Sequence, residues 1–123
     1  MLQQDKAEDF VLATGTTTAV RDFVSKAFAE LDIEVEWHGI GVEEKGVDSS
    51  TGKVLVEVDP NYYRPTEVDQ LLGDPTKARE KLGWKPQYDL DALVKDMVRS
   101  DLHLAKKDNH LKDGGYRVLN YFE

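Results

Sequence analysis

The side chains best suited to binding chemistry lie in one short segment, Asn61-Tyr62-Tyr63-Arg64-Pro65-Thr66-Glu67-Val68-Asp69. Arg64 could donate a bidentate pair of hydrogen bonds to a phosphate. The N–H groups of the helix start that follows would favour the same anion. Glu67 or Asp69 could accept hydrogen bonds from ribose hydroxyls. Alternatively, Arg64 pairs with one of these carboxylates and both tyrosines pack on the core, and the residues alone leave the two interpretations balanced.

Three glycine and tyrosine patterns that would indicate catalysis or cofactor binding fail. Gly39-Ile40-Gly41 begins like a dinucleotide fingerprint, but its third glycine would fall at Glu44. Gly41 and Gly46 have the separation of a P-loop, but Val47 stands where lysine is required. No tyrosine is followed by lysine four positions later, so the proton-transfer pair of short-chain dehydrogenases is absent. These three patterns therefore indicate no catalytic and no cofactor-binding residue.

The histidines and adjacent acids do not indicate a metal site. His38, His103 and His110 do not share the spacing of a metal-binding helix face, and no cysteine is present. Glu43 and Glu44 are adjacent carboxylates, for which a solvated loop is the simpler interpretation. We predict no metal ligand.

Composition narrows the class of protein. The chain has 123 residues, no cysteine and a net charge of −8. That charge argues against broad binding to nucleic acid or to an anionic membrane. The longest apolar run is only 10–13, which is too short for a membrane span. Residues 1–13 lack the pattern of a signal peptide. We expect one domain over 1–123, with a core that buries roughly two-thirds of the unfolded surface.

The first forty residues predict a strand, a helix and a second strand. Residues 9–14 predict a short buried strand, and a threonine among 16–18 is expected to cap the next helix. The helix follows from apolar residues at helical spacing, Val20, Phe23, Val24, Ala27, Phe28 and Leu31. Alternation over 33–37 predicts a half-buried strand. This order favours an α/β fold.

The second half predicts a β-hairpin, short helices and a long C-terminal helix. The hairpin strands are expected near 46–48 and 54–58, and Thr66 is expected to begin a short helix. Asp74 and Gly83 mark the ends of a helix over 75–82. Asp89 should cap the last helix, with Lys106 and Lys107 near its end. Its expected buried face is Leu90, Leu93, Val94, Met97, Val98, Leu102 and Ala105. The apolar tail 116–122 should pack on the chain or on a neighbour.

Three segments resemble the C-terminal part of the GDP-mannose 4,6-dehydratase family. They are Gly41-Val42-Glu43-Glu44-Lys45-Gly46, Val58-Asp59-Pro60-Asn61-Tyr62-Tyr63-Arg64-Pro65-Thr66-Glu67-Val68 and Leu72-Gly73-Asp74-Pro75-Thr76-Lys77-Ala78-Arg79-Glu80-Lys81-Leu82-Gly83-Trp84-Lys85-Pro86. The third is similar to a stretch found in many extended short-chain dehydrogenases, while the first two resemble the GDP-mannose branch. The opening Met1-Leu2-Gln3-Gln4-Asp5 resembles mid-chain sequence of that family, and segment 47–53 looks shorter than in some relatives.

The resemblance implies a cytoplasmic homo-oligomeric lyase that converts GDP-mannose to GDP-4-keto-6-deoxymannose on the GDP-fucose pathway, using NADP. It implies that Arg64 reaches the nucleotide diphosphate and that Glu67 faces the ribose. The family's glycine fingerprint and catalytic residues lie upstream of this segment. The resemblance therefore implies the C-terminal, substrate-binding portion of a larger Rossmann-type enzyme.

Two functional hypotheses follow from this resemblance. In the first, the chain is a fragment of the lyase that is inactive alone, holds no NADP and binds GDP weakly or not at all. In the second, it is a stand-alone α/β interaction module derived from the enzyme by truncation. The resemblance of Met1 to mid-chain sequence favours the fragment.

Overall fold

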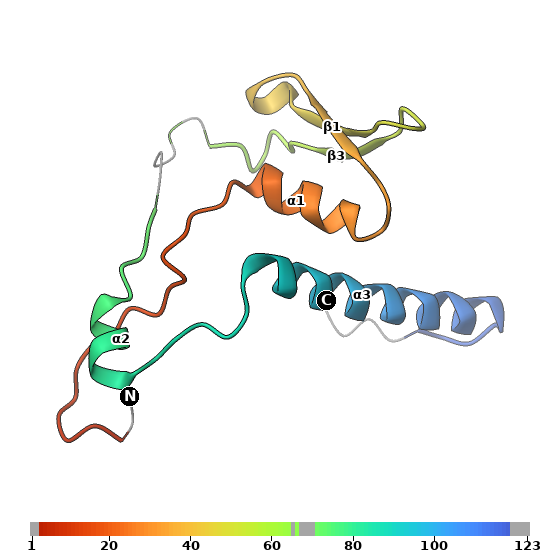
Figure 1. The fold of residues 1–123 in the computed structure, drawn as a ribbon. Coiled ribbons are helices and arrows are strands. Elements are labelled where there is room, and N and C mark those ends of the chain that lie inside the picture. Colours follow the sequence, from red (N-terminus) through yellow and green to blue (C-terminus); the bar gives the residue numbers. More distant parts are fainter. Residues whose placement is uncertain (1–2, 65, 67–70, 119–123) are drawn as a thin grey trace.

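The structure, a computed structural model, describes residues 3–64, 66 and 71–118. Its elements are α1 (Val20–Ala29), β1 (Val35–His38), the 3-10 turn η1 (Gly41–Glu43), β2 (Lys45–Asp48), β3 (Val54–Glu57), α2 (Thr76–Leu82) and α3 (Leu90–Asp113). The strands form one antiparallel sheet in the order β1-β2-β3. Figure 1 shows α1 lying between this sheet and α3. The predicted mixture of helices with a small sheet is confirmed.

The hairpin agrees with the sequence prediction. β1 pairs with β2 so that Trp37 lies opposite Gly46, and β2 pairs with β3 across an irregularity at Gly46 and Val47. A Cβ on Gly46 would lie 3.0 Å from the Val35 side chain, so the buried glycine allows the neighbouring side chains to close over the strand. The Asp48 carboxylate closes the connecting loop by accepting hydrogen bonds from Ser50 and Thr51.

The strand predicted over 9–14 is wrong. This segment has no strand pairing and instead runs beside α2 and the chain before it (Figure 1). Lys77 Nζ donates to the Asp9 carbonyl at 2.9 Å, and Arg79 donates to the Thr14 carbonyl at 3.3 Å. A strand needs a neighbour that offers its backbone groups. Among the described residues, this segment instead contacts side chains of α2 and lies next to Gly73.

Helix α1 has the predicted apolar face, but its predicted cap is wrong. The helix starts after Ala19, which offers no side-chain cap, so none of the threonines at 16–18 caps it. Thr14 and Thr16 hydrogen-bond to each other at 3.1 Å instead. The helix stops at Ala29 because Asp32, with φ of 58°, turns the chain into the left-handed region.

The ends of α2 and the start of α3 follow the sequence signals. The Asp74 carboxylate accepts from the Thr76 N–H at 2.9 Å, but the N-cap of α2 is Pro75, one residue later than predicted. Gly83 ends α2 with φ of 63°. The Asp89 carboxylate accepts from the Ala92 N–H at 2.9 Å and caps α3. These caps are local features, which explains why they could be predicted.

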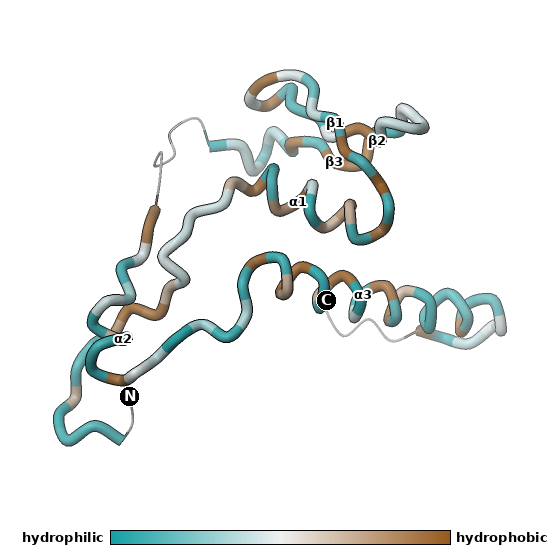
Figure 2. The backbone as a smooth tube through the Cα atoms, in the orientation of Figure 1, coloured by the Kyte–Doolittle hydropathy of each residue, from teal (hydrophilic) through white to brown (hydrophobic). Residues whose placement is uncertain are grey.

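The C-terminal part of α3 departs from prediction. The helix continues to Asp113, so Lys106 and Lys107 lie within it rather than at its end. Of the face expected to be buried, only Val94 is buried, while Leu93, Met97 and Leu102 are exposed. The reason is that α1 has 10 residues and packs along only part of the 24-residue α3. Figure 2 shows hydrophobic positions alternating with hydrophilic ones along α3. In the tail, Tyr116 is exposed and Val118 is half-buried, and 119–123 lie outside the described residues.

The fold is more open than the length predicts. The accessible surface is 10759 Å² for 13.9 kDa, whereas a compact monomer of that mass exposes about 6,700 Å². The expected burial of two-thirds of the unfolded surface is therefore not reached. No helix in the described ranges is long and apolar enough to cross a membrane.

Candidate functional site

The segment that leads to Arg64 is a tight turn at the end of β3. The Asp59 carboxylate accepts hydrogen bonds from the Asn61 backbone N–H at 2.8 Å and from its side-chain amide at 2.9 Å. The Asp59 carbonyl accepts from the N–H groups of Tyr62 and Tyr63 at 3.0 and 3.1 Å. Asp59 thus fixes the backbone up to the residue before Arg64.

The two tyrosines of this turn have different surroundings. Tyr62 is 84% exposed, whereas Tyr63 is 44% exposed. The Tyr63 hydroxyl lies against Gly41, where an added Cβ would approach it to 3.2 Å. Neither tyrosine is buried, so the expectation that both pack on the core is wrong. The carboxylates that the same alternative pairs with Arg64 lie outside the described residues.

Arg64 is exposed directly after this turn. Thr66 lies in a bend, while Glu67, Asp69 and the helix start predicted after Thr66 lie outside the described residues. The roles of Arg64 at a diphosphate and of Glu67 at a ribose therefore stay predictions.

A second charged cluster, which the sequence did not indicate, connects α1 to the hairpin. The Arg21 guanidinium pairs with Glu44 and lies 5.7 Å from the centre of the Trp37 ring. Trp37 Nε1 donates to the Ser25 hydroxyl at 2.9 Å. The Glu44 side chain is only 19% exposed, so the prediction of a solvated loop is wrong for this residue. The arginine and the glutamate are too far apart in sequence for any spacing rule to reveal the pair.

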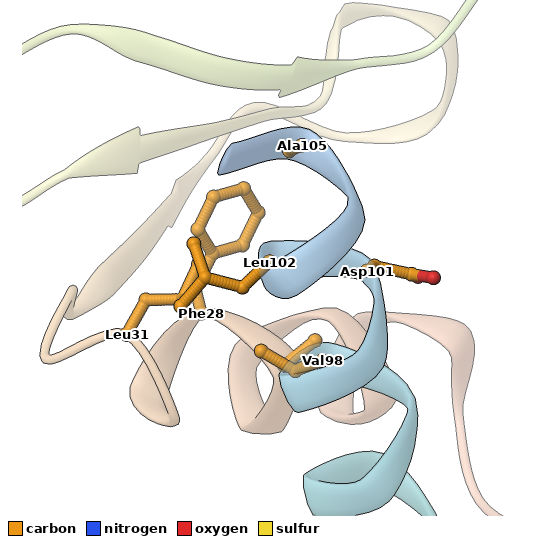
Figure 3. A pocket seen from close by; sticks show the side chains of 7 residues that line it. Phe28, Leu31, Val98, Asp101, Leu102 and Ala105 are labelled. Carbon is orange, nitrogen blue, oxygen red and sulfur yellow. The ribbon is translucent and has the colours of Figure 1, made fainter. Parts of the chain in front are cut away.

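An apolar groove lies between α1 and the middle of α3 (Figure 3). Its volume is about 330 Å³, and its lining is Ala27, Phe28, Leu31, Val98, Asp101, Leu102 and Ala105. Phe28 and Leu102 both line this groove, and in Figure 3 the Leu102 side chain points to the side of Phe28 while the Asp101 side chain points away from it. The groove offers shape and apolar surface but no converging polar groups of the kind that catalysis requires.

The resolved pKa shifts belong to structural contacts. Hydrogen bonds from Lys81 and Lys77 lower the pKa of Glu8 to about 2. Hydrogen bonds from Ser50 and Thr51 lower the pKa of Asp48 to about 2. Glu8 holds the N-terminal segment against α2, and Asp48 holds the loop between β2 and β3.

The histidines do not gather with other ligands in the described part of the chain. His38 lies 3.6 Å from Glu36 on the same strand. Among the described residues, no group of three or more His, Asp or Glu side chains could hold a metal ion.

Comparisons with known proteins point to one family. The model of the family described as GDP-mannose 4,6 dehydratase matches residues 1–97. The chain is 57% identical over 102 residues to the GDP-mannose 4,6-dehydratase of Sinorhizobium fredii, covering 83% of this chain and 29% of that protein. It is 51% identical over 106 residues to the human GDP-mannose 4,6 dehydratase, covering 86% of this chain and 28% of that protein. For the Vibrio cholerae GDP-mannose 4,6-dehydratase the identity is 46%, covering 96% of this chain and 34% of that protein. The chain thus spans about a third or less of the length of these relatives.

Proposed function

This chain belongs to the GDP-mannose 4,6-dehydratase family, and from that premise we propose that it forms the C-terminal, substrate-binding part of such an enzyme. The reaction would be the dehydration of GDP-mannose to GDP-4-keto-6-deoxymannose, on the route to GDP-fucose. The observation that carries the proposal is the family match, which includes the whole turn that presents Arg64.

In this proposal Arg64 contacts the diphosphate of GDP-mannose and Glu67 faces the ribose. Arg64 is exposed and follows a turn that Asp59 holds with four hydrogen bonds. A guanidinium on a fixed backbone loses less conformational entropy on binding a phosphate than one on a loose loop. The site is incomplete by itself, because it supplies a contact to the nucleotide and no group that reacts with the sugar.

Catalysis and NADP binding would fall to residues outside these 123. The sequence has neither the glycine fingerprint nor the Tyr-x-x-x-Lys pair that extended short-chain dehydrogenases use. We therefore propose that the isolated chain is inactive as a dehydratase and holds no NADP. Its single domain would pack on the nucleotide-binding part of a homo-oligomeric enzyme in the cytoplasm, and the large accessible surface supports such a neighbour.

A titration of the purified chain with millimolar GDP, followed by two-dimensional amide NMR, tests the site. We expect weak binding that shifts the amides around Arg64 and is lost in Arg64→Ala. Arg99→Ala is the matched control, because Arg99 is an exposed arginine on α3, away from the turn. Binding that Arg64→Ala leaves unchanged would contradict the assignment of Arg64.

An activity assay tests the other half of the proposal. With GDP-mannose and NADP supplied, the purified chain should give no GDP-4-keto-6-deoxymannose. Product formed in proportion to the amount of chain would mean that catalytic residues are present after all.

One observation favours the second candidate, a stand-alone interaction module. Large apolar residues of α3, Leu93, Met97 and Leu104, are exposed, and such side chains suit a protein partner. The DNA upstream of the codon for Met1 separates the candidates. An in-frame glycine fingerprint and Tyr-x-x-x-Lys pair would support the enzyme, whereas a start signal with nothing upstream would support the module.

A further inference from the structure

The failed glycine fingerprint Gly39-Ile40-Gly41 has a structural role in this fold. Gly39 and Gly41 have φ of 85° and 63°, a region that side-chain-bearing residues rarely adopt. A Cβ on Gly39 would lie 2.3 Å from the Glu43 carbonyl oxygen. Gly39 therefore allows the last residue of η1 to approach the backbone that precedes η1.

The second glycine faces the turn that presents Arg64. A Cβ on Gly41 would lie 3.2 Å from the Tyr63 hydroxyl oxygen and 3.8 Å from the ring carbon that carries it. A residue with a Cβ at position 41 would require the Tyr63 hydroxyl to move by a few tenths of an ångström. The end of the Tyr63 side chain thus lies next to Gly41.

Helix α1 holds η1 in place. Glu44, the residue after η1, pairs with Arg21 in the first turn of α1, and Arg21 also lies over the Trp37 ring of β1. The surface beneath Tyr63 is therefore fixed to two elements rather than to a free loop.

We infer that Tyr63 is a positioning residue for Arg64, and that its position depends on the contact of its hydroxyl end with Gly41. The inference rests on the proposed function, in which Arg64 contacts the diphosphate of a nucleoside diphosphate sugar. Asp59 fixes the start of the turn through the N–H groups of Tyr62 and Tyr63. The Tyr63 side chain fixes the end of the turn next to Arg64, so that the backbone at Arg64 has one orientation.

Tyr62 is the matched control for this role. It is in the same turn and of the same residue type, but it is 84% exposed. A role that depended on aromatic character or turn propensity alone would affect both tyrosines equally.

The first experiment measures GDP affinity in the purified chain with GDP itself as the probe. Tyr63→Ala should weaken binding by up to about tenfold, because the freed backbone must be ordered on binding. Tyr63→Phe should retain most of the affinity, and Tyr62→Ala should leave it unchanged. Equal losses in Tyr62→Ala and Tyr63→Ala would overturn the inference.

The second experiment tests the contact through a double variant. Gly41→Ala should weaken GDP binding less in the Tyr63→Phe background than in the parent, because removing the hydroxyl gives the new methyl group room. Strictly additive effects would mean that Gly41 and Tyr63 do not act on each other.

Two further measurements separate failure of this inference from failure of the proposed function. If Arg64→Ala weakens GDP binding and Tyr63→Ala does not, the positioning role is wrong and the Arg64 contact stands. If Arg64→Ala has no effect, the proposed function is wrong.

The contact itself can be measured without GDP. The Tyr63 ring should shift the Gly41 α-proton resonances, and that shift should vanish in Tyr63→Ala while the amide resonances of β2 and β3 stay unchanged. Its absence in the parent would contradict the contact itself.

Discussion

The backbone N–H of Ile33 donates a hydrogen bond of 3.1 Å to the carbonyl oxygen of Phe28. The Asp32 N–H donates to the Ala29 carbonyl at 3.0 Å, and Asp32 has φ of 58°. Together these bonds form a Schellman motif, in which the left-handed position is usually glycine. An aspartate occupies it in this chain, and it sets the direction in which the backbone leaves α1 for β1.

Replacing this aspartate should stabilise the fold. Asp32→Gly removes the steric cost of the left-handed conformation and should raise the free energy of unfolding by about 0.5 kcal/mol, after allowance for the greater freedom of glycine in the unfolded chain. Urea denaturation gives the measurement. Glu30→Gly is the control, since Glu30 is right-handed helical with φ of −66°, and it should lose about 1 kcal/mol. A loss of stability in Asp32→Gly would contradict the steric explanation.

The uncapped start of α1 offers a second stabilising change. Ala19 has the extended conformation of an N-cap, with φ of −66° and ψ of 145°, but no side-chain oxygen. Ala19→Ser should raise the free energy of unfolding by about 1 kcal/mol, with Asp22 placed to complete a capping box. Ala29→Ser, at the other end of the same helix, should give no gain. Equal effects of the two substitutions in thermal unfolding would rule out capping as the cause.

The contact between residues 8–17 and α2 should weaken in acid. Glu8 lies 2.8 Å from Lys81 Nζ and 2.9 Å from Lys77 Nζ, and these partners lower its pKa from 4.5 to about 2. Because the folded pKa lies below the unfolded one, the stabilisation is fully present above about pH 4.5 and is lost as the pH falls toward 2. Amide chemical shifts of residues 8–14, followed through an acid titration, check this prediction.

Two substitutions show whether Glu8 is responsible. Glu8→Gln should abolish the acid-dependent change in those shifts. Glu80→Gln should preserve the acid-dependent change. Glu80 lies on α2 together with Lys77 and Lys81, and it makes no ion pair with the N-terminal segment among the described residues. An unchanged titration in Glu8→Gln would assign the acid response to another group.

Gly73 should be intolerant of a side chain. A Cβ at this position would lie 2.6 Å from the Ala13 Cβ, which is closer than real carbon atoms approach. Gly73→Ala should therefore cost about 1–3 kcal/mol of stability. Ala13→Gly in the same chain should restore much of the loss, because it removes the opposing methyl group. A double variant as unstable as the sum of the single variants would show that the two residues do not touch.

The features that the sequence predicted well depend on residues close together in the chain. The β2–β3 hairpin follows from a turn between two β-prone runs, and the ends of α2 follow from Asp74 and Gly83. The cap at Asp89 bonds to a residue three positions away. The likeness of the Arg64 segment to one family was also readable directly, because a motif is a property of consecutive residues.

The sequence by itself determined the helices, the hairpin and the family, whereas the tertiary structure decided what their surfaces meet. Segment 9–14 has the composition of a strand, but it lies beside α2, and pairing requires a neighbouring backbone that composition does not specify. The apolar face of α3 is real, but its burial depends on how far α1 reaches. The contacts that surround the Arg64 turn, Arg21 with Glu44 and Tyr63 with Gly41, join residues about twenty apart in the chain. Such pairs form only when the chain has folded, because their energy comes from proximity in space and not from spacing in sequence.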